Sequence, residues 1–290
     1  MRSLKQILMP TDFSPRSVDV ARYAAGIAHH FHSQITLLNV LPPINPAWVA
    51  TAPFALTPDL IEHQKEQLRD GLRELSCNEF KDVSVSQVVL EGDPADVIAR
   101  YATTTHVGLV MMPTRGCGAF RRFLLGSVTA KVLHDVNCPV WTSSHVIEGP
   151  GRAAAIPKII VCAIDLTAGG DQILRWASDL ASDLSASLVV VHVSSFEFQP
   201  ETYYLEAEMR RKLVDAAKAR IEKVIDSSRT PTATVHVEGG AVSTVVRSVI
   251  EDRKADLLII GRSSSHGVLG RLRTHSYALI RESPCPVISI

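Results

Sequence analysis

A glycine-rich loop in the first half of the chain has the residue types and spacing expected of a phosphate-binding loop. Gly116 follows an apolar run at residues 107–112, and nine residues, 117–125, separate it from Gly126-Ser127. Glycines let the backbone approach an anion closely, and a helix that begins near Ser127 directs free N–H groups and the positive end of its dipole toward phosphate. Three arginines add positive charge to the same loop: Arg115, Arg121 and Arg122. The loop is therefore predicted to bind an anion; the alternative is a plain turn between a strand and a helix.

An aspartate at the end of another apolar run is the second candidate. Residues 7–10 are apolar, and Asp12 follows them. Ligands of doubly wound sheets bind beyond the carboxyl ends of the strands, where the strand order reverses, so Asp12 and Gly116 are predicted to be neighbours in space. The alternative role of Asp12 is that of a helix-entry residue that accepts hydrogen bonds from backbone N–H groups.

The candidate residues favour binding over catalysis. No Ser-His-Asp arrangement, lysine nucleophile or pair of catalytic carboxylates can be placed on the loop. Ser127 lacks an evident base, because His134 lies about two helical turns further along the chain. The eleven histidines form no HxxxH or HxxEH pattern, so no metal site is predicted. Cys117 is either a redox-sensitive thiol whose pKa nearby arginines would lower or simply a small loop residue.

The two halves of the chain repeat one another. Asp165 ends a second apolar run, as the first aspartate does, and the Cys-Pro-Val of residues 138–140 recurs at residues 285–287. A duplication of this size indicates two copies of one fold. We expect two domains, residues 1–145 and 156–290, joined by an exposed linker with Glu-Gly-Pro-Gly-Arg at its centre.

Strands and helices are predicted to alternate in both halves. Runs of strand length occur at residues 7–10, 35–41, 83–90, 107–112 and 139–142, and again near residues 158–164, 187–193, 232–238, 256–260 and 286–290. Alternation of this kind implies a parallel sheet with helices on both faces. The predicted fold class is α/β, with two tandem doubly wound domains of the Rossmann-like or flavodoxin-like type, each a five-stranded parallel sheet.

The composition argues against several classes of partner and location. Lysine plus arginine equals aspartate plus glutamate, 30 against 30, so no basic field is available to hold nucleic acid or an anionic membrane. No apolar run approaches the roughly 18 residues needed to cross a membrane, and the N-terminus lacks the apolar core of a signal peptide. The five cysteines form no CxxC pair, which favours free thiols in a reducing cytoplasm.

Three segments resemble the universal stress protein family: Pro-Thr-Asp-Phe-Ser at residues 10–14, Leu-Leu-Gly-Ser-Val at residues 124–128, and Cys-Pro-Val at residues 138–140. The resemblance covers essentially the whole chain as two tandem domains. Nucleotide-binding members of the family carry Gly, two residues, Gly, nine residues and then Gly-Ser or Gly-Thr. Gly116 and the following Gly-Ser pair match this pattern, but Pro113 stands at the first glycine. Since proline has no N–H and cannot take a positive φ, one phosphate or ribose contact is expected to be missing or replaced.

The resemblance implies that the first domain binds ATP, with or without Mg²⁺. Asp12 would contact the adenosine part of the nucleotide. Asn39 and Val40 would line the adenine pocket, and Ser127 would hold the phosphates. The full set of implied binding residues is Pro10, Asp12, Asn39, Val40, Pro113, Thr114, Arg115, Gly116, Cys117, Gly126, Ser127 and Val128.

The second copy of the loop departs further from the family pattern. Gly261 keeps the first glycine, but Ser264 stands near the second and Arg273 at the third. Thr274 keeps the hydroxyl that follows the third glycine. We expect this half to be degraded for nucleotide binding or altered for another ligand.

The sequence therefore predicts a cytoplasmic universal stress protein that binds ATP mainly in its first domain and acts through a nucleotide-dependent change of shape or partner. One alternative is an enzyme, a weak ATP hydrolase or a nucleotidyl-transfer relative. The other is an interaction scaffold that binds no nucleotide. The resemblance also implies an intrachain pseudo-dimer of the two domains, paired through residues 139–142 and 287–290, and further association of two chains as a homodimer.

Overall fold

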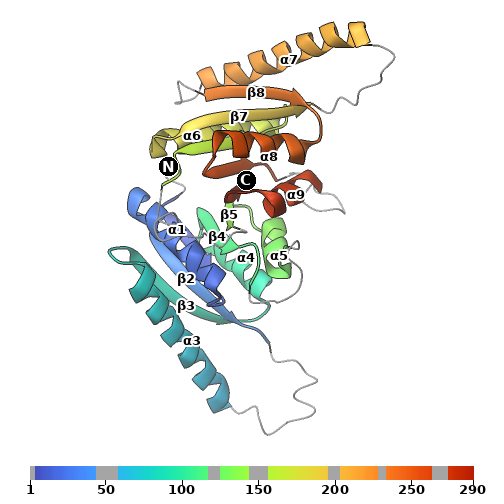
Figure 1. The fold of residues 1–290 in the computed structure, drawn as a ribbon. Coiled ribbons are helices and arrows are strands. Elements are labelled where there is room, and N and C mark those ends of the chain that lie inside the picture. Colours follow the sequence, from blue (N-terminus) through green and yellow to red (C-terminus); the bar gives the residue numbers. More distant parts are fainter. Residues whose placement is uncertain are drawn as a thin grey trace. The chain divides into compact units, whose positions relative to one another are not determined.

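A computed structural model of the chain describes residues 4–43, 58–116, 125–143, 156–194, 203–227, 233–262 and 274–290 (Figure 1). The chain divides into two compact units, Arg2–Ile156 and Pro157–Ile290. The predicted domain bounds, 1–145 and 156–290, stay predictions, because the residues between the two domains lie outside the described part.

Five parallel strands form the sheet of the first unit. They are β1 (Gln6–Pro10), β2 (Gln34–Leu41), β3 (Ser84–Glu91), β4 (Leu109–Pro113) and β5 (Val140–Ser143), in the order β3-β2-β1-β4-β5. β1 and β4 are buried apart from Gln6, as expected of near-continuous apolar strands covered on both faces. The strand order reverses between β1 and β4, because the chain runs outward through β2 and β3 before it returns.

Two helices cover each face of this sheet (Figure 1). The two on one face are α1 (Pro15–Phe31) and α3 (Pro58–Glu79), and the two on the other face are α4 (Pro94–Thr104) and α5 (Ser127–Asp135). α5 is the short helix that follows the glycine-rich loop. It packs beside α4 on the sheet, and this packing positions its first turn.

Helix α1 begins as the sequence predicts. Ser14 caps the helix by accepting a hydrogen bond from the N–H of Ser17 (3.3 Å), and Pro15 occupies the first turn. The small residues on one side of the helix are buried against the sheet: Ala21, Ala24 and Ala28. Their size lets α1 lie close to the central strands, which fixes the position of its first turn beside the end of β1.

The second unit repeats this topology. Its strands are β6 (Ile159–Ala163), β7 (Ser187–Ser194), β8 (Ala233–Gly239), β9 (Leu257–Ile260) and β10 (Val287–Ser289), parallel and in the order β10-β9-β6-β7-β8. Its helices are α6 (Ala168–Leu184), α7 (Tyr203–Asp226), α8 (Val242–Arg253) and α9 (Thr274–Glu282). The predicted fold class is confirmed: both units are doubly wound five-stranded parallel sheets with helices on both faces.

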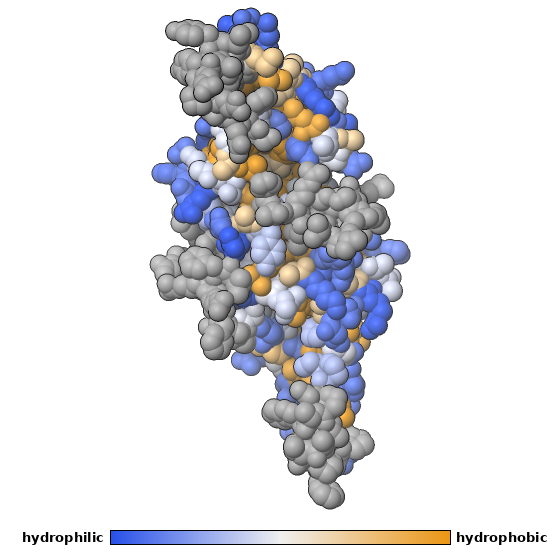
Figure 2. All heavy atoms as spheres, turned by 90° about the vertical axis from the view of Figure 1, so that its right-hand side faces the viewer, coloured by the Kyte–Doolittle hydropathy of each residue, from blue (hydrophilic) through white to orange (hydrophobic). Residues whose placement is uncertain are grey.

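The described surface mixes polar and apolar residues, as the face drawn in Figure 2 shows. Three large apolar side chains of the described residues are exposed, Leu60, Met209 and Leu213. Scattered side chains of this kind are normal on globular domains. Among the described residues, no helix combines the length and the apolar character that crossing a membrane requires.

Candidate ligand-binding site

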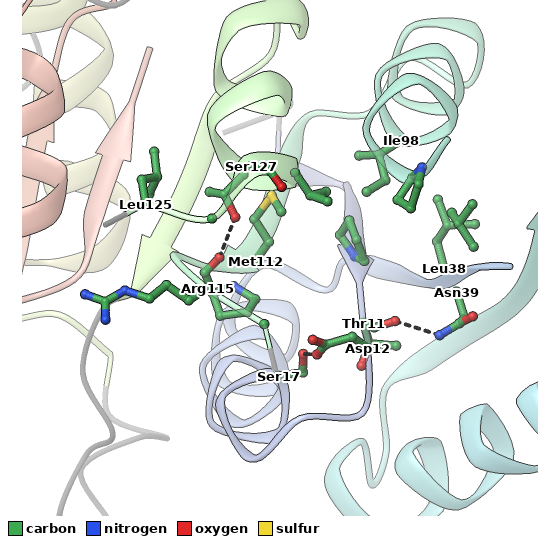
Figure 3. Close-up of a pocket in the computed structure, with 18 residues that line it drawn as sticks. Thr11, Asp12, Ser17, Leu38, Asn39, Ile98, Met112, Arg115, Leu125 and Ser127 are labelled. Atoms are coloured by element: carbon green, nitrogen blue, oxygen red, sulfur yellow. Dashed lines mark hydrogen bonds between the residues drawn. The ribbon is translucent and has the colours of Figure 1, made fainter. Parts of the chain in front are cut away.

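A cavity of about 520 Å³ opens in the first unit, where the strand order reverses at the carboxyl ends of β1 and β4 (Figure 3). Doubly wound folds bind ligands in this crevice, and the volume lies within the range of small-molecule sites, about 300–1,000 Å³. The lining residues are Pro10, Thr11, Asp12, Ser17, Leu38, Asn39, Val40, Pro94, Ile98, Met112, Pro113, Arg115, Gly116, Leu125, Gly126, Ser127, Val128 and Thr129.

Ten of the twelve residues that the resemblance implies line this one cavity. Thr114 does not, because its side chain is buried and its Oγ1 donates a hydrogen bond to the carbonyl oxygen of Ser143 (3.2 Å). Cys117 lies outside the described residues, as do Arg121 and Arg122. The structure therefore brings the predicted residues together, and their contacts with a ligand stay predictions.

Eight lining residues were not singled out from the sequence: Thr11, Ser17, Leu38, Pro94, Ile98, Met112, Leu125 and Thr129. Most adjoin a predicted residue in the sequence, so the rule that strand ends form the site would have found them. Pro94 and Ile98 come from α4, which packs beside α5. That packing is a tertiary contact without a local sequence signal.

The carboxyl ends of β1 and β2 are held together by a buried amide. Asn39 Nδ2 donates a hydrogen bond to the carbonyl oxygen of Thr11 (2.8 Å), as Figure 3 shows. The N–H of Thr11 donates to the carbonyl oxygen of Leu38 (2.9 Å). Because both bonds are internal, the backbone next to Asn39 is fixed before any ligand binds.

The start of α5 forms another side of the cavity. Gly126 is the N-cap residue and supplies no side-chain hydrogen bond to the first turn. Its own N–H donates to the carbonyl oxygen of Thr114 (2.8 Å). Ser127, the first residue of the helix, is exposed. A helix terminus without a capping side chain keeps its N–H groups available to an anion.

Two guanidinium groups lie near the same loop. Arg16, in the first turn of α1, donates a hydrogen bond from Nη1 to the carbonyl oxygen of Gly116 (3.4 Å). Burial, and after it the positive charge of Arg16, hold the pKa of Arg115 below its usual range. In Figure 3 the Arg115 side chain extends away from Asp12 and Asn39. Positive charge is therefore concentrated at one margin of the cavity, where it favours a negatively charged ligand.

The Asp12 carboxylate and Gly116 are neighbours, as predicted. A Cβ atom added to Gly116 would lie 2.3 Å from Asp12 Oδ2. The other carboxylate oxygen, Oδ1, accepts hydrogen bonds from the hydroxyl of Ser17 (2.7 Å) and the N–H of Ser14 (3.1 Å). The helix-entry role that was the alternative for Asp12 is thus present in the structure, and the same side chain also lines the cavity.

Phe13, directly after Asp12, has an uncommon backbone conformation. Its φ is +59°, in the left-handed region that costs a residue other than glycine about 1–3 kcal/mol. The N–H of Phe13 donates to Thr11 Oγ1 (3.1 Å). The Phe13 ring lies against α3, where a Cβ atom added to Gly71 would be 3.0 Å from Cζ of the ring. The absence of a side chain at Gly71 makes room for this ring.

Equivalent hydrogen bonds in the two units support the alignment of Gly261 with Pro113. Thr129 Oγ1 donates to the carbonyl oxygen of Pro113 (3.0 Å), and Ser276 Oγ donates to that of Gly261, also at 3.0 Å. Gly261 therefore corresponds to Pro113, as predicted. Proline is accommodated at this position in the first unit because residue 113 ends β4 in strand conformation.

The second unit differs at the base of the corresponding crevice. His192 replaces Asn39, and its Nδ1 contacts the carbonyl oxygen of Ile164 (3.1 Å). A Cβ atom added to Gly261 would lie 2.4 Å from Cδ1 of Ile173, on α6. The loop residues Ser264 and Arg273, and the side chain of Thr274, lie outside the described part. The expected loss or alteration of nucleotide binding in the second domain therefore stays a prediction.

The described residues contain no group of three or more histidine, cysteine, aspartate or glutamate side chains placed to hold a metal ion. The carboxylate of Asp12 is the acidic group that lines the cavity.

The fold and the cavity together define a class: a tandem pair of doubly wound α/β domains with a ligand crevice in the first. The family model described as "Universal stress protein family" matches residues 3–143 and 157–290. The chain belongs to the universal stress protein family.

Similar proteins cover either half or nearly all of the chain. The chain is 25% identical over 277 residues to a universal stress protein of Mycolicibacterium smegmatis, and the alignment covers 92% of this chain and 90% of that protein. It is 29% identical over 138 residues to universal stress protein MJ0531 of Methanocaldococcus jannaschii, covering 47% of this chain and 79% of the relative. A universal stress protein from Archaeoglobus fulgidus has the same fold, with a TM-score of 0.66, 20% identity, and coverage of 99% and 98%.

Proposed function

We propose that the first domain binds an adenine nucleotide, ATP, and that the chain acts in the cytoplasm as a nucleotide-dependent stress-response or signalling module. The observation that carries the proposal is the two-sided character of the cavity. Leu38, Val40 and Ile98 give it an apolar side suited to a purine ring. The uncapped start of α5 and the charge of Arg115 give it a side suited to phosphates.

We infer that the first domain binds its ligand without rapid catalysis, because the described residues place no general base beside the Ser127 hydroxyl. Lys131, the basic residue that follows Ser127 most closely, is paired with Asp93 and Asp96. His134 has its Nδ1 hydrogen-bonded to Asp135 Oδ1 (2.7 Å) at the far end of α5. A general base has to reach within about 3 Å of the group that it deprotonates. We therefore place the activity in ligand-dependent recognition, and a slow ATP hydrolase remains the rival that a turnover assay tests.

The first measurement is mass spectrometry of the nucleotide that denaturation releases from purified protein, with its stoichiometry per chain. We expect ATP at about one molecule per chain, since a ligand of the native state remains bound when its concentration exceeds its Kd. Two molecules per chain would show that the second loop also binds. An absence of released nucleotide, together with no binding of added ATP at millimolar concentration, would reject the proposal in favour of the scaffold.

Gly126 offers a matched pair of variants. A Cβ atom there would lie 3.3 Å from the carbonyl oxygen of Thr114, so Gly126→Ala measures the effect of crowding alone. Gly126→Asp adds a negative charge at the N-terminus of α5, where the phosphates are proposed to bind. We expect ATP affinity to fall at least tenfold further in Gly126→Asp than in Gly126→Ala, because like charges repel in the same small space. Equal affinities would contradict a phosphate contact there.

Three further features belong to the same proposal. Titration with ATP in EDTA and in magnesium distinguishes binding of the free nucleotide from binding of its Mg²⁺ complex. The pairing of the two domains within the chain through residues 139–142 and 287–290, which the family resemblance implies, stays a prediction. Two chains associate as a homodimer, which sedimentation or light scattering measures directly.

A further inference from the structure

The Asp12 carboxylate is held in one orientation by a short chain of hydroxyl groups. Ser17 Oγ donates to Asp12 Oδ1 (2.7 Å). Ser14 Oγ lies 3.3 Å from Ser17 Oγ, and since the single hydroxyl proton of Ser17 goes to Asp12, Ser14 is the donor in that pair. The carboxylate is therefore tied to the first turn of α1 through Oδ1, and Oδ2 lies against Gly116 at the cavity wall.

Ser17 is almost completely inaccessible to solvent, with 1% of its surface exposed. A buried hydroxyl is costly unless it makes hydrogen bonds, and the bond of Ser17 to a charged acceptor belongs to the stronger class. Burial keeps water away from the Ser17 hydroxyl, whereas Asp12 itself is exposed. The contact between Ser17 and Asp12 is thus a fixed part of the cavity wall.

The second unit shows what happens when this serine is absent. Gly170 occupies the corresponding position, in the first turn of α6. A Cβ atom added there would lie 2.0 Å from the carbonyl oxygen of Asp165 and 2.9 Å from its Oδ1. The backbone of Asp165 thus takes the space that the serine side chain occupies in the first unit. Its Oδ1 instead accepts a hydrogen bond from the neighbouring Thr167 Oγ1 (2.6 Å).

The backbone conformation differs between the two units in the same place. Phe13 has a φ of +59°, whereas the corresponding Leu166 is not among the described residues with a positive φ. The left-handed turn at Phe13 thus accompanies the arrangement that leaves room for Ser17. A residue other than glycine keeps this conformation only where its surroundings hold it there.

We propose that Ser17 is a positioning residue that orients the Asp12 carboxylate toward the nucleoside part of the bound nucleotide, and that Gly170 removes this function from the second domain. The inference rests on the proposed nucleotide binding of the first domain. A carboxylate held by Ser17 is ordered before the ligand arrives, so that binding does not have to order it. Immobilising one side chain costs about 0.5–1.5 kcal/mol on binding, so a carboxylate that is no longer held by Ser17 corresponds to a loss of about twofold to tenfold in affinity.

The test is calorimetric titration of the full chain, freed of nucleotide, with two probes: ATP, and inorganic tripolyphosphate in competition with it. We expect Ser17→Ala to weaken the affinity for ATP by about twofold to tenfold and to leave the affinity for tripolyphosphate unchanged, because Asp12 is assigned to the nucleoside part. Ser17→Cys keeps a side chain of similar size with a weak donor, and we expect it to lower the affinity for ATP as well. Ser178→Ala, which removes a fully buried serine of α6, is the matched control and is expected to bind both probes as the wild type does.

The outcomes separate the two proposals. A wild-type protein that does not bind ATP would reject the proposed function itself. ATP affinity that is unchanged in Ser17→Ala, or a loss of equal size for both probes, would overturn the role of Ser17 while leaving nucleotide binding in place.

Discussion

Gly116 leaves no room for a side chain, because the carboxylate of Asp12 occupies the space where a Cβ atom would be. That carboxylate cannot turn aside freely, since Ser17 and Ser14 both donate hydrogen bonds to its Oδ1. The glycine required by the family pattern is therefore explained in this chain by a contact within the protein. The same contact makes the shape of the cavity sensitive to a single methyl group.

We expect Gly116→Ala to lower both ATP affinity and stability. The added Cβ would lie 2.3 Å from Asp12 Oδ2, so the carboxylate has to turn away from its hydrogen bonds with Ser14 and Ser17. The loss of one such bond costs about 0.5–1.5 kcal/mol. Urea unfolding measures the stability, and calorimetric titration measures the affinity. Gly169→Ala is the matched control: its Cβ would be 3.6 Å from the nearest atom, Thr167 Oγ1, so neither quantity is expected to fall. An unchanged ATP affinity in Gly116→Ala would contradict the predicted site.

Helices α4 and α5, which both line the cavity, are joined by a pair of ion pairs. Lys131 of α5 lies 2.7 Å from Asp96 Oδ1 and 3.3 Å from Asp93 Oδ1. Asp93 is also the N-cap of α4, where it accepts a hydrogen bond from the N–H of Asp96 (3.1 Å). The bond from this N–H, together with Lys131, holds the pKa of Asp93 below its usual range.

This lowered pKa predicts a pH-dependent contribution of Asp93 to stability. A carboxyl whose pKa is lower in the folded state stabilises the protein above its unfolded pKa, and the contribution is lost as the pH falls through the folded value. Asn caps helices about as well as Asp, so Asp93→Asn removes mainly the charge. We expect its melting temperature to be below that of the wild type at pH 7, with the difference beginning to shrink at about pH 4 and disappearing once the pH is below the folded pKa of Asp93. A difference that is independent of pH would assign the effect to the cap alone.

At the scale of the whole molecule, the cysteines distinguish the two units. Cys162 and Cys285 are buried in the second unit, and Cys77 is exposed in the first. Burial raises the pKa of the Cys285 thiol to about 11 and raises that of Cys162 as well. The thiolate is the reactive form. Both buried thiols are therefore slow to react, because reagents do not reach them and because they stay protonated.

We expect a thiol reagent at pH 8 to modify Cys77 in the native protein and to leave Cys162 and Cys285 unmodified until the second unit unfolds. Peptide mapping after timed labelling measures each site separately. Labelling in urea provides the control, since all three are expected to react there. Modification of Cys285 at the rate of Cys77 in native buffer would contradict the burial of Cys285.

Local patterns in the sequence predicted the repeat and the strands, because each strand is an apolar run bounded by turn residues. They also predicted that Asp12 and Gly116 are neighbours, since both follow central strands of a doubly wound sheet. The contributions of Pro94 and Ile98 could not be predicted, because α4 reaches the cavity only through tertiary packing. The contact of Ser17 with Asp12 accompanies the left-handed φ of Phe13, which no local pattern indicates.

The ring of Phe13 gives helix α3 a connection to the cavity. The ring fills the space above Gly71, and it belongs to the residue that follows Asp12. A shift of α3 across the sheet would change the room for this ring and, through it, the position of the carboxylate. Ligand binding and the position of α3 would then be thermodynamically linked. Because such coupling is reciprocal, a molecule that moves α3 changes the affinity for the ligand by the same factor as the ligand changes the affinity for that molecule.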